Sequence, residues 1–240
     1  MIPLDAQIRA VLFDIDDTLV DLGTAMARAV RASSAEFVPE LSEQEWDRLC
    51  WGFQADPEGY YDAFLRGELE FVGQRVARAR LAFASVGGGL PDAQVEGWNA
   101  AYESEAQRHW QPYPDVLPVL DALDASGIRY GAVSNNVESY QRRKLDIAGL
   151  SRISVLVGTD TVGVPKPDPR IFQEGVRQLG FSVSQTLYVG DNLLVDALGA
   201  TQAGLPALWL NREGLAAESV DGQRWDGPQT STLAELPEFL

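Results

Sequence analysis

Short apolar runs alternate with amphipathic stretches from about Tyr113 to about Leu210. The runs have the length of buried strands, and a glycine follows each of the helical stretches between them. Such an alternation predicts a mostly parallel sheet with helices on both faces. The expected strands are 128–133, 153–157, 186–189 and 207–210, and the expected helices are 115–126, 138–148, 169–179 and 193–203.

One further strand lies far from this region in the sequence. Residues 8–15 contain a short apolar run that ends in acidic residues, which is typical of a buried parallel strand with a site at its carboxyl end. A single strand cannot bury itself, so it must join the same sheet. The sequence therefore predicts a Rossmann-like, doubly wound α/β core made of residues 1–20 and 111–240.

The segment between the two parts of this core, residues 21–110, contains no convincing strand. Ser42-Glu-Gln-Glu45 has the pattern of a capping box at the start of a helix. Asp56-Pro57 predicts a second helix start, with Asp56 as the N-cap and proline in the first helical position. Residues 75–83 and 93–109 also show helical spacing. We expect an inserted all-helical domain, a bundle of four or five helices.

Composition limits the partners of the chain. An excess of acidic over basic residues gives a formal net charge of −16, and such a surface repels nucleic acids and anionic membranes, so we expect neither as a partner. Cys50 is the single cysteine, so no intrachain disulfide can form. No signal-peptide pattern or membrane-spanning apolar run is present. A cytoplasmic location is the default expectation, and the sequence predicts no oligomeric state.

Chemically capable side chains follow four of the predicted strands. In a doubly wound sheet, ligands bind beyond the carboxyl ends of the strands, so these positions are candidates for a site. They are Asp14 and Asp16 after the first strand, Ser134 and Asn135 after the second, Lys166 in the loop after the third, and Asp191 and Asp196 after the fourth.

The carboxylates among these side chains predict a bound cation. Asp14 and Asp16 are two residues apart in an extended segment, so both point the same way, and Asp191 adds a third negative charge. Like charges this close would force some carboxylates to protonate unless a cation compensates them. A hard, oxygen-preferring ion meets this need, and Mg²⁺ suits a site that also holds a phosphate. Lys166 supplies a second positive charge.

Taken together, the four segments resemble the motifs of the haloacid dehalogenase (HAD) superfamily of phosphatases. The stretch from Asp14 to Leu19 resembles the motif DxDxT, and Val133-Ser-Asn135 resembles the second motif. Lys166-Pro-Asp-Pro169 resembles the third motif, and Gly190-Asp191 with Asp196 resembles the fourth. The motifs occur in the order of the family over nearly the whole chain. Their intervals suit the variant with a helical cap between the first two motifs, although Asn192 stands where serine is common.

The resemblance implies hydrolysis of a small phosphorylated metabolite through an aspartyl-phosphate. Asp14 would attack phosphorus. Asp16 would protonate the leaving oxygen and then take a proton from water. Ser134, Asn135 and Lys166 would bind the transferring phosphoryl group, with Lys166 also offsetting the charge of the nucleophile.

The resemblance also implies a ligand set for Mg²⁺. Asp14, the backbone carbonyl of Asp16, and Asp191 would hold the ion, and Asp196 would bind it or orient its water shell. Residues 21–110 would form the cap that excludes water and selects the leaving group. Arginines of this segment could contact a second anionic group or be solvated, and they are Arg66, Arg75 and Arg78.

Three other functions remain open at this point. A haloacid dehalogenase displaces halide from carbon and typically lacks a carboxylate at the position of Asp16, so Asp16 favours phosphoryl transfer. A phosphomutase shares the aspartyl-phosphate and is harder to separate by sequence. A non-catalytic binding protein on this fold has no reason to keep the whole set of charged groups. Asp17 and Thr18 are expected to serve the turn after the first strand. The sequence does not identify the substrate.

Overall fold

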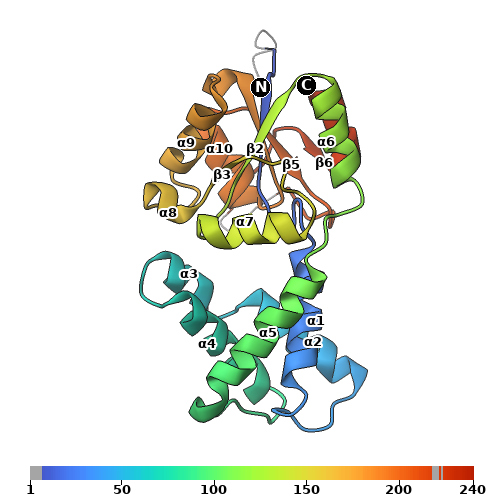
Figure 1. Ribbon diagram of the computed structural model, residues 1–240, viewed down its shortest axis with the longest axis vertical. Coiled ribbons are helices and arrows are strands. Elements are labelled where there is room, and N and C mark those ends of the chain that lie inside the picture. The colour runs from blue at the N-terminus through green and yellow to red at the C-terminus, as the bar shows by residue number, and fades with distance from the viewer. Residues whose placement is uncertain (1–6, 218–221, 223) are drawn as a thin grey trace. The chain divides into compact units, whose positions relative to one another are not determined.

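A computed structural model describes residues 7–217, 222 and 224–240 of the protein. The chain forms two compact units (Figure 1). The first, called the core unit, contains the residues up to Asp21 and Gln111–Leu240. The second, called the helical unit, is Leu22–Trp110. Within the described residues, no helix is both long enough and apolar enough to cross a membrane.

A six-stranded sheet forms the centre of the core unit. Its strand order is β3-β2-β1-β4-β5-β6, and every neighbouring pair is parallel. The predicted parallel sheet is therefore confirmed, with β1 at its centre. The polar tail, for which the sequence predicts no element, adds β6 to the edge of the sheet. The strands are β1 Ala10–Phe13, β2 Arg129–Val133, β3 Val155–Val157, β4 Thr186–Gly190, β5 Ala207–Leu210 and β6 Gln229–Thr230.

Helices connect the strands of the core unit and bury the sheet. The strongly amphipathic helix α9 packs against β1, β2 and β3, and Gly175 lets it approach the sheet because a Cβ there would lie 2.8 Å from a methyl of Leu12. The Asp168 side chain caps this helix, and Gly180 ends it with a positive φ, which confirms the glycine expected after residues 169–179. Helix α9 is Pro169–Leu179. The other helices among the described residues of this unit are α6 Val116–Ala125, α7 Glu138–Ile147, α8 Thr159–Val162, η2 Val183–Gln185, η3 Leu193–Leu198, α10 Gly199–Gln202 and η4 Leu233–Phe239.

The predicted helix 193–203 differs from expectation. It begins as a π-helix, η3 Leu193–Leu198, and continues as the short α10. The side chain of Asn192 accepts hydrogen bonds from the backbone N–H groups of Leu194 and Val195, which fixes the start of η3. Wide helical turns of this kind often occur at functional sites, and this one places the buried Asp196 beneath the end of β4.

The helical unit contains five α-helices and one short 3-10 helix. Its interior is aromatic, and the Trp98 ring makes edge contacts with the rings of Phe53 and Phe83. The capping box predicted at Ser42 and Glu45 is confirmed at the start of α2. The helices are α1 Leu22–Ser34, α2 Glu43–Ala55, α3 Tyr60–Leu65, α4 Phe71–Ala84, η1 Asp92–Gln94 and α5 Val95–His109.

The predicted helix start at Asp56-Pro57 is wrong. Asp56 is the C-cap of α2 in a left-handed conformation (φ 46°), and α3 begins only at Tyr60. The Asp56 carboxylate still caps α3, because it accepts hydrogen bonds from the N–H groups of Tyr60 and Tyr61. The sequence signal for capping was correct, but the turn between the helices moved the helix start by three residues.

Candidate active site

The first feature of the site is a buried lysine beside the central strand. Asp14 follows β1 directly, and its backbone N–H is fixed to the carbonyl of Val189 in β4. The Lys166 ammonium lies 2.5 Å from Asp14 Oδ1 and 2.8 Å from Asp196 Oδ1. All three side chains are less than 10% exposed. Segments separated by about 150 residues of sequence therefore place one cation between two carboxylates at the carboxyl end of the sheet.

A tyrosine of β4 completes the surroundings of this lysine. The Tyr188 hydroxyl lies 3.1 Å from the Lys166 ammonium and donates a hydrogen bond to Asp196 Oδ1. The backbone N–H of Asn192 donates to the other oxygen, Asp196 Oδ2. Gly190 gives Asp196 its space, because a Cβ at this position would lie 2.5 Å from the carboxyl carbon. Both oxygens of Asp196 thus accept hydrogen bonds from the protein.

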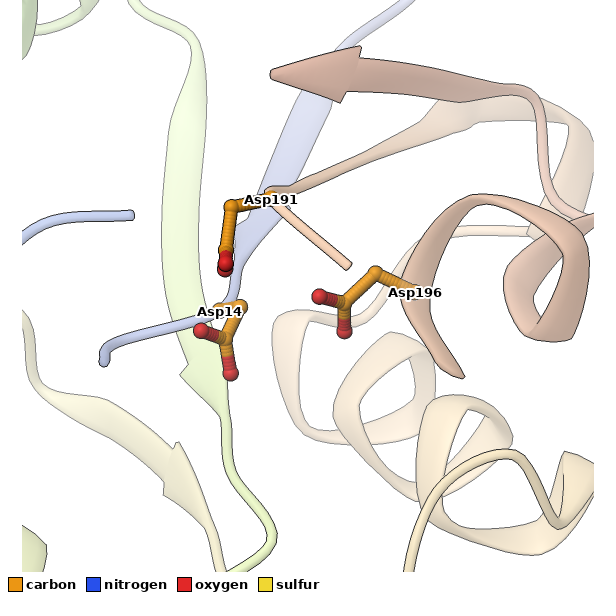
Figure 2. A group of neighbouring side chains, drawn as sticks. All are labelled: Asp14, Asp191 and Asp196. Atoms are coloured by element: carbon orange, nitrogen blue, oxygen red, sulfur yellow. The ribbon is translucent and has the colours of Figure 1, made fainter. Parts of the chain in front are cut away.

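Three carboxylates are close enough to share one ion. Oxygens of Asp14, Asp191 and Asp196 lie within 4.8 Å of one another, and Figure 2 shows these three side chains gathered around a common space. The Thr18 hydroxyl donates to Asp191 Oδ1 at 3.0 Å and accepts from the backbone N–H of Asp191 at 3.1 Å. Thr18 therefore connects the loop after β1 to the loop after β4, beyond its expected part in the turn.

Burial and crowding shift the ionisation of this group. Burial, opposed by the charge of Lys166, raises the pKa of Asp14 to about 7. Burial and the charges of Asp14 and Asp196 raise the pKa of Asp191 above its usual range. Burial would lower the pKa of Lys166, but the charges of Asp14 and Asp196 outweigh it and raise this pKa. Carboxylates that resist ionisation in the absence of a cation are typical of a site that binds one.

Asp16 lies in a second cluster of the core unit. Its carboxylate forms an ion pair with the buried Lys144 ammonium through Oδ1. The side-chain amide of Gln141 donates to Asp16 Oδ2 at 2.8 Å and to the Ser134 hydroxyl at 2.6 Å. Gln141, a residue of helix α7 that the sequence did not single out, therefore connects Asp16 and Ser134, which are both predicted site residues.

The contacts of Asn135 differ from those of the other candidates. Its side-chain amide accepts from the backbone N–H of Lys166 at 2.6 Å and donates to the Lys166 carbonyl at 3.0 Å. These two bonds attach the loop that carries Lys166 to the end of β2. In the structure, Asn135 holds a neighbouring loop, and a direct contact with substrate remains a prediction.

The three arginines that the sequence left open as anion contacts or solvated side chains have protein partners. Arg66 is exposed and pairs with Glu68. Arg75 and Arg78 are buried in the helical unit, where Arg75 pairs with Glu103 and Arg78 donates to the carbonyl of Phe53. Arg75 and Arg78 are therefore not solvated, which was one of the two possibilities that the sequence left open.

Comparison with known proteins identifies the family. Residues 8–204 match the haloacid dehalogenase-like hydrolases, so the chain belongs to this family, as the four motifs indicated. The glyceraldehyde 3-phosphate phosphatase of Methanopyrus kandleri is 31% identical over 215 residues, which cover 85% of this chain and 84% of that protein.

Solved structures share the fold. A HAD-type hydrolase of Bacillus subtilis, solved bound to magnesium, superposes with a TM-score of 0.79 at 22% identity and covers 98% of this chain and 99% of its own. The L-2-haloacid dehalogenase of Xanthobacter autotrophicus gives a TM-score of 0.72 at 19% identity, with 97% of this chain and 98% of its own covered. At these identities the likeness shows the fold alone, so function must be argued from the site.

Proposed function

We propose that the protein hydrolyses small phosphate monoesters with the help of Mg²⁺, through an aspartyl-phosphate on Asp14. The observation that carries this proposal is the convergence of Lys166, Asp191 and Asp196 on Asp14 at the carboxyl end of the sheet. The 31% identical relative named as a phosphatase of a small sugar phosphate supports this substrate class.

The residues of the site suit the two chemical steps. An oxygen of Asp14 forms a bond to phosphorus while the bond to the leaving oxygen breaks, and Asp16 gives the leaving oxygen a proton. Water then attacks the phosphorus of the aspartyl-phosphate, Asp16 takes its proton, and Asp14 is released. Lys166 and the Ser134 hydroxyl stabilise the charge on the phosphoryl oxygens during both steps.

The donor set fits a hard divalent cation. Asp14 and Asp191 would hold Mg²⁺ together with the backbone carbonyl of Asp16, since carboxylates and carbonyls are the ligands that this ion prefers. Asp196 accepts from Lys166, Tyr188 and the Asn192 N–H, so its role would be to orient Lys166 and the water shell of the ion. When bound, Mg²⁺ neutralises negative charge on the phosphoryl group.

The helical unit is proposed to select the leaving group. It is inserted directly after the loop that carries Asp14 and Asp16, which is the arrangement of a cap in this family. Asp16 also separates hydrolysis of a phosphate ester from dehalogenation, because displacement of halide from carbon needs no proton donor for the leaving group.

The test is release of inorganic phosphate from a panel of phosphorylated metabolites, with Mg²⁺ and with a chelator. We expect release with Mg²⁺, loss of release with the chelator, and recovery when Mg²⁺ is added back. Transfer of phosphate to another position of a sugar would indicate a phosphomutase. Halide release from 2-chloropropionate without metal would indicate a dehalogenase, and a chelator-insensitive release would overturn the metal site.

A further inference from the structure

The chain contains two lysines among its 19 basic residues, and both are buried. Lys166 contacts Asp14 and Lys144 contacts Asp16, so each lysine is paired with one aspartate of the same short loop. Every other basic residue is arginine. A lysine ammonium is a compact point charge that suits a single carboxylate oxygen. Lys144 therefore shares with Lys166 its residue type, its burial and an aspartate partner in the loop after β1.

The burial of Lys144 is not explained by packing. Helix α7 buries only Gln141, Lys144 and Leu145, which lie on one face of the helix. An apolar side chain is the usual occupant of such positions, since burying an ammonium carries a large desolvation cost. The Lys144 side chain is 2% exposed, and it reaches across 128 residues of sequence to Asp16. The ion pair that offsets this cost is formed with the proposed acid–base residue.

The side-chain amide of Gln141 is also buried to hold Asp16. A carboxylate can only accept hydrogen bonds, so the Gln141 atom that faces Asp16 must be the NH₂ group. Its two hydrogens go to Asp16 Oδ2 and to the Ser134 hydroxyl oxygen. Within the described part of the chain, the Gln141 Oε1 is buried and has no hydrogen-bond partner. An orphaned acceptor is destabilising, so the amide is better explained by what its NH₂ group holds.

These contacts define an orientation for two groups of the proposed chemistry. Both oxygens of Asp16 are held by donors, while its side chain remains 24% exposed. These donors fix the orientation of the Asp16 carboxylate, while part of the side chain stays accessible to water. The Ser134 hydroxyl oxygen accepts from Gln141, which leaves its own hydrogen free to be donated to a phosphoryl oxygen.

We propose that Lys144 and Gln141 are positioning residues that align Asp16 as the base for hydrolysis of the aspartyl-phosphate. This inference rests on the proposed function. In that step the oxygen of water forms a bond to phosphorus and its proton passes to the Asp16 carboxylate. The bond from phosphorus to the Asp14 oxygen breaks, which returns the Asp14 carboxylate and releases inorganic phosphate. Gln141 has a second effect, because it also fixes the Ser134 hydroxyl.

p-Nitrophenyl phosphate separates this step from the first one. Its leaving group is acidic enough to depart without a proton donor, so formation of the aspartyl-phosphate does not depend on Asp16. Rapid-mixing measurements would record the burst of p-nitrophenolate and the decay of acid-quenched phosphoenzyme. The variants are Lys144→Met and Gln141→Leu, with Arg143→Met as a matched control, because Arg143 is an exposed cation on the same helix.

In Lys144→Met, we expect phosphoenzyme decay to slow by at least about tenfold, since general base catalysis contributes about 10²- to 10⁴-fold, while the burst rate stays close to wild type. Phosphoenzyme should therefore accumulate. Gln141→Leu should slow both phases, with decay affected more strongly. Arg143→Met should change neither phase.

Equal slowing of burst and decay in both variants would show a merely structural role and overturn the inference. Thermal unfolding is measured alongside. Gln141→Leu removes two donated hydrogen bonds, but it also removes a buried acceptor that has no partner, and these two changes oppose each other in stability. We therefore expect this variant to stay folded, so it carries the test if Lys144→Met unfolds. A wild-type protein that forms no phosphoenzyme would instead overturn the proposed function, and the inference with it. The two failures are thus distinguishable.

Discussion

Lys166 in the core unit and Arg78 in the helical unit are both buried cations, but their partners are of different kinds. Lys166 contacts carboxylates and a phenol that come from separate segments at the end of the sheet. Arg78 donates to the carbonyls of Phe53 and Gln54 and lies over the Phe53 ring. Those carbonyls belong to the last turn of α2, where no N–H group of the helix follows to donate a hydrogen bond to them.

The difference shows that burial of a charge does not by itself identify a site. Arg78 satisfies backbone groups and covers an aromatic ring, so its contribution is to the stability of the helical unit. Lys166 is surrounded by side chains whose charges repel one another without it, and that arrangement has little use in a fold except to hold an anion or a cation. The comparison therefore predicts that substitutions at the two positions affect different properties.

The largest effect is expected at Asp14. Asp14→Asn should abolish turnover, because an amide cannot replace the carboxylate as nucleophile, while the fold is retained. Phosphate release and circular dichroism together check this. Activity that survives in the folded variant would remove Asp14 from the nucleophile role.

Lys166→Met comes next. We expect turnover to fall by about 10²- to 10³-fold, the usual loss when one group that stabilises charge in the transition state is removed. The loss should appear in kcat. A variant with unchanged kcat and a lower melting temperature would place Lys166 with Arg78 as a structural cation and would end the contrast between them.

Arg78→Met should act on stability. Loss of its hydrogen bonds leaves buried carbonyls without donors, and we expect the free energy of unfolding to fall by about 2–4 kcal/mol. Arg48→Met is the control, since Arg48 is an exposed arginine of α2 and should change stability by less than about 0.5 kcal/mol. Denaturant titration measures both. Equal losses of stability in the two variants would show that the Arg78 contacts contribute nothing specific.

In the metal-free protein, we expect Asp14 to make the stability of the fold depend on pH, and this effect should be smaller than those of the substitutions above. Burial raises its pKa from 3.8 to about 7, so between these values the folded state binds more protons than the unfolded state. Stability must then decrease as pH rises through this range. Thermal unfolding in the presence of a chelator should show wild type losing stability relative to Asp14→Asn from about pH 4 to pH 7. The prediction would be contradicted if the stability of wild type relative to Asp14→Asn stayed constant or increased over this pH range.

The parallel sheet could be predicted because its signals are local. Apolar runs mark the strands, and glycines such as Gly180 stop the helices, so the positions after the strands could be found as well. The structure brings Asp14, Asp191 and Asp196 together because parallel strands end at one edge of the sheet. Their roles remain proposals.

Other parts of the site depend on contacts that the sequence does not reveal. Gln141 and Lys144 have ordinary helical spacing, and what makes them unusual is burial against a residue more than 120 positions away. Thr18 looked like a turn residue because its partner Asp191 is 173 positions away in the sequence. Strand β6 lacks an apolar run, so only its pairing with β5 identifies it. The scarcity of lysine was the one available signal for Lys144.

The most direct test of the account is chemical identification of the phosphorylated residue. The protein is mixed with p-nitrophenyl phosphate and Mg²⁺, quenched, and treated with borohydride, which reduces an aspartyl-phosphate to homoserine. Peptide mass spectrometry should then find homoserine at position 14, and none in protein incubated without substrate. Homoserine at another aspartate, or phosphate turnover with no modification at position 14, would contradict the claim that Lys166 and the neighbouring carboxylates serve a nucleophilic Asp14.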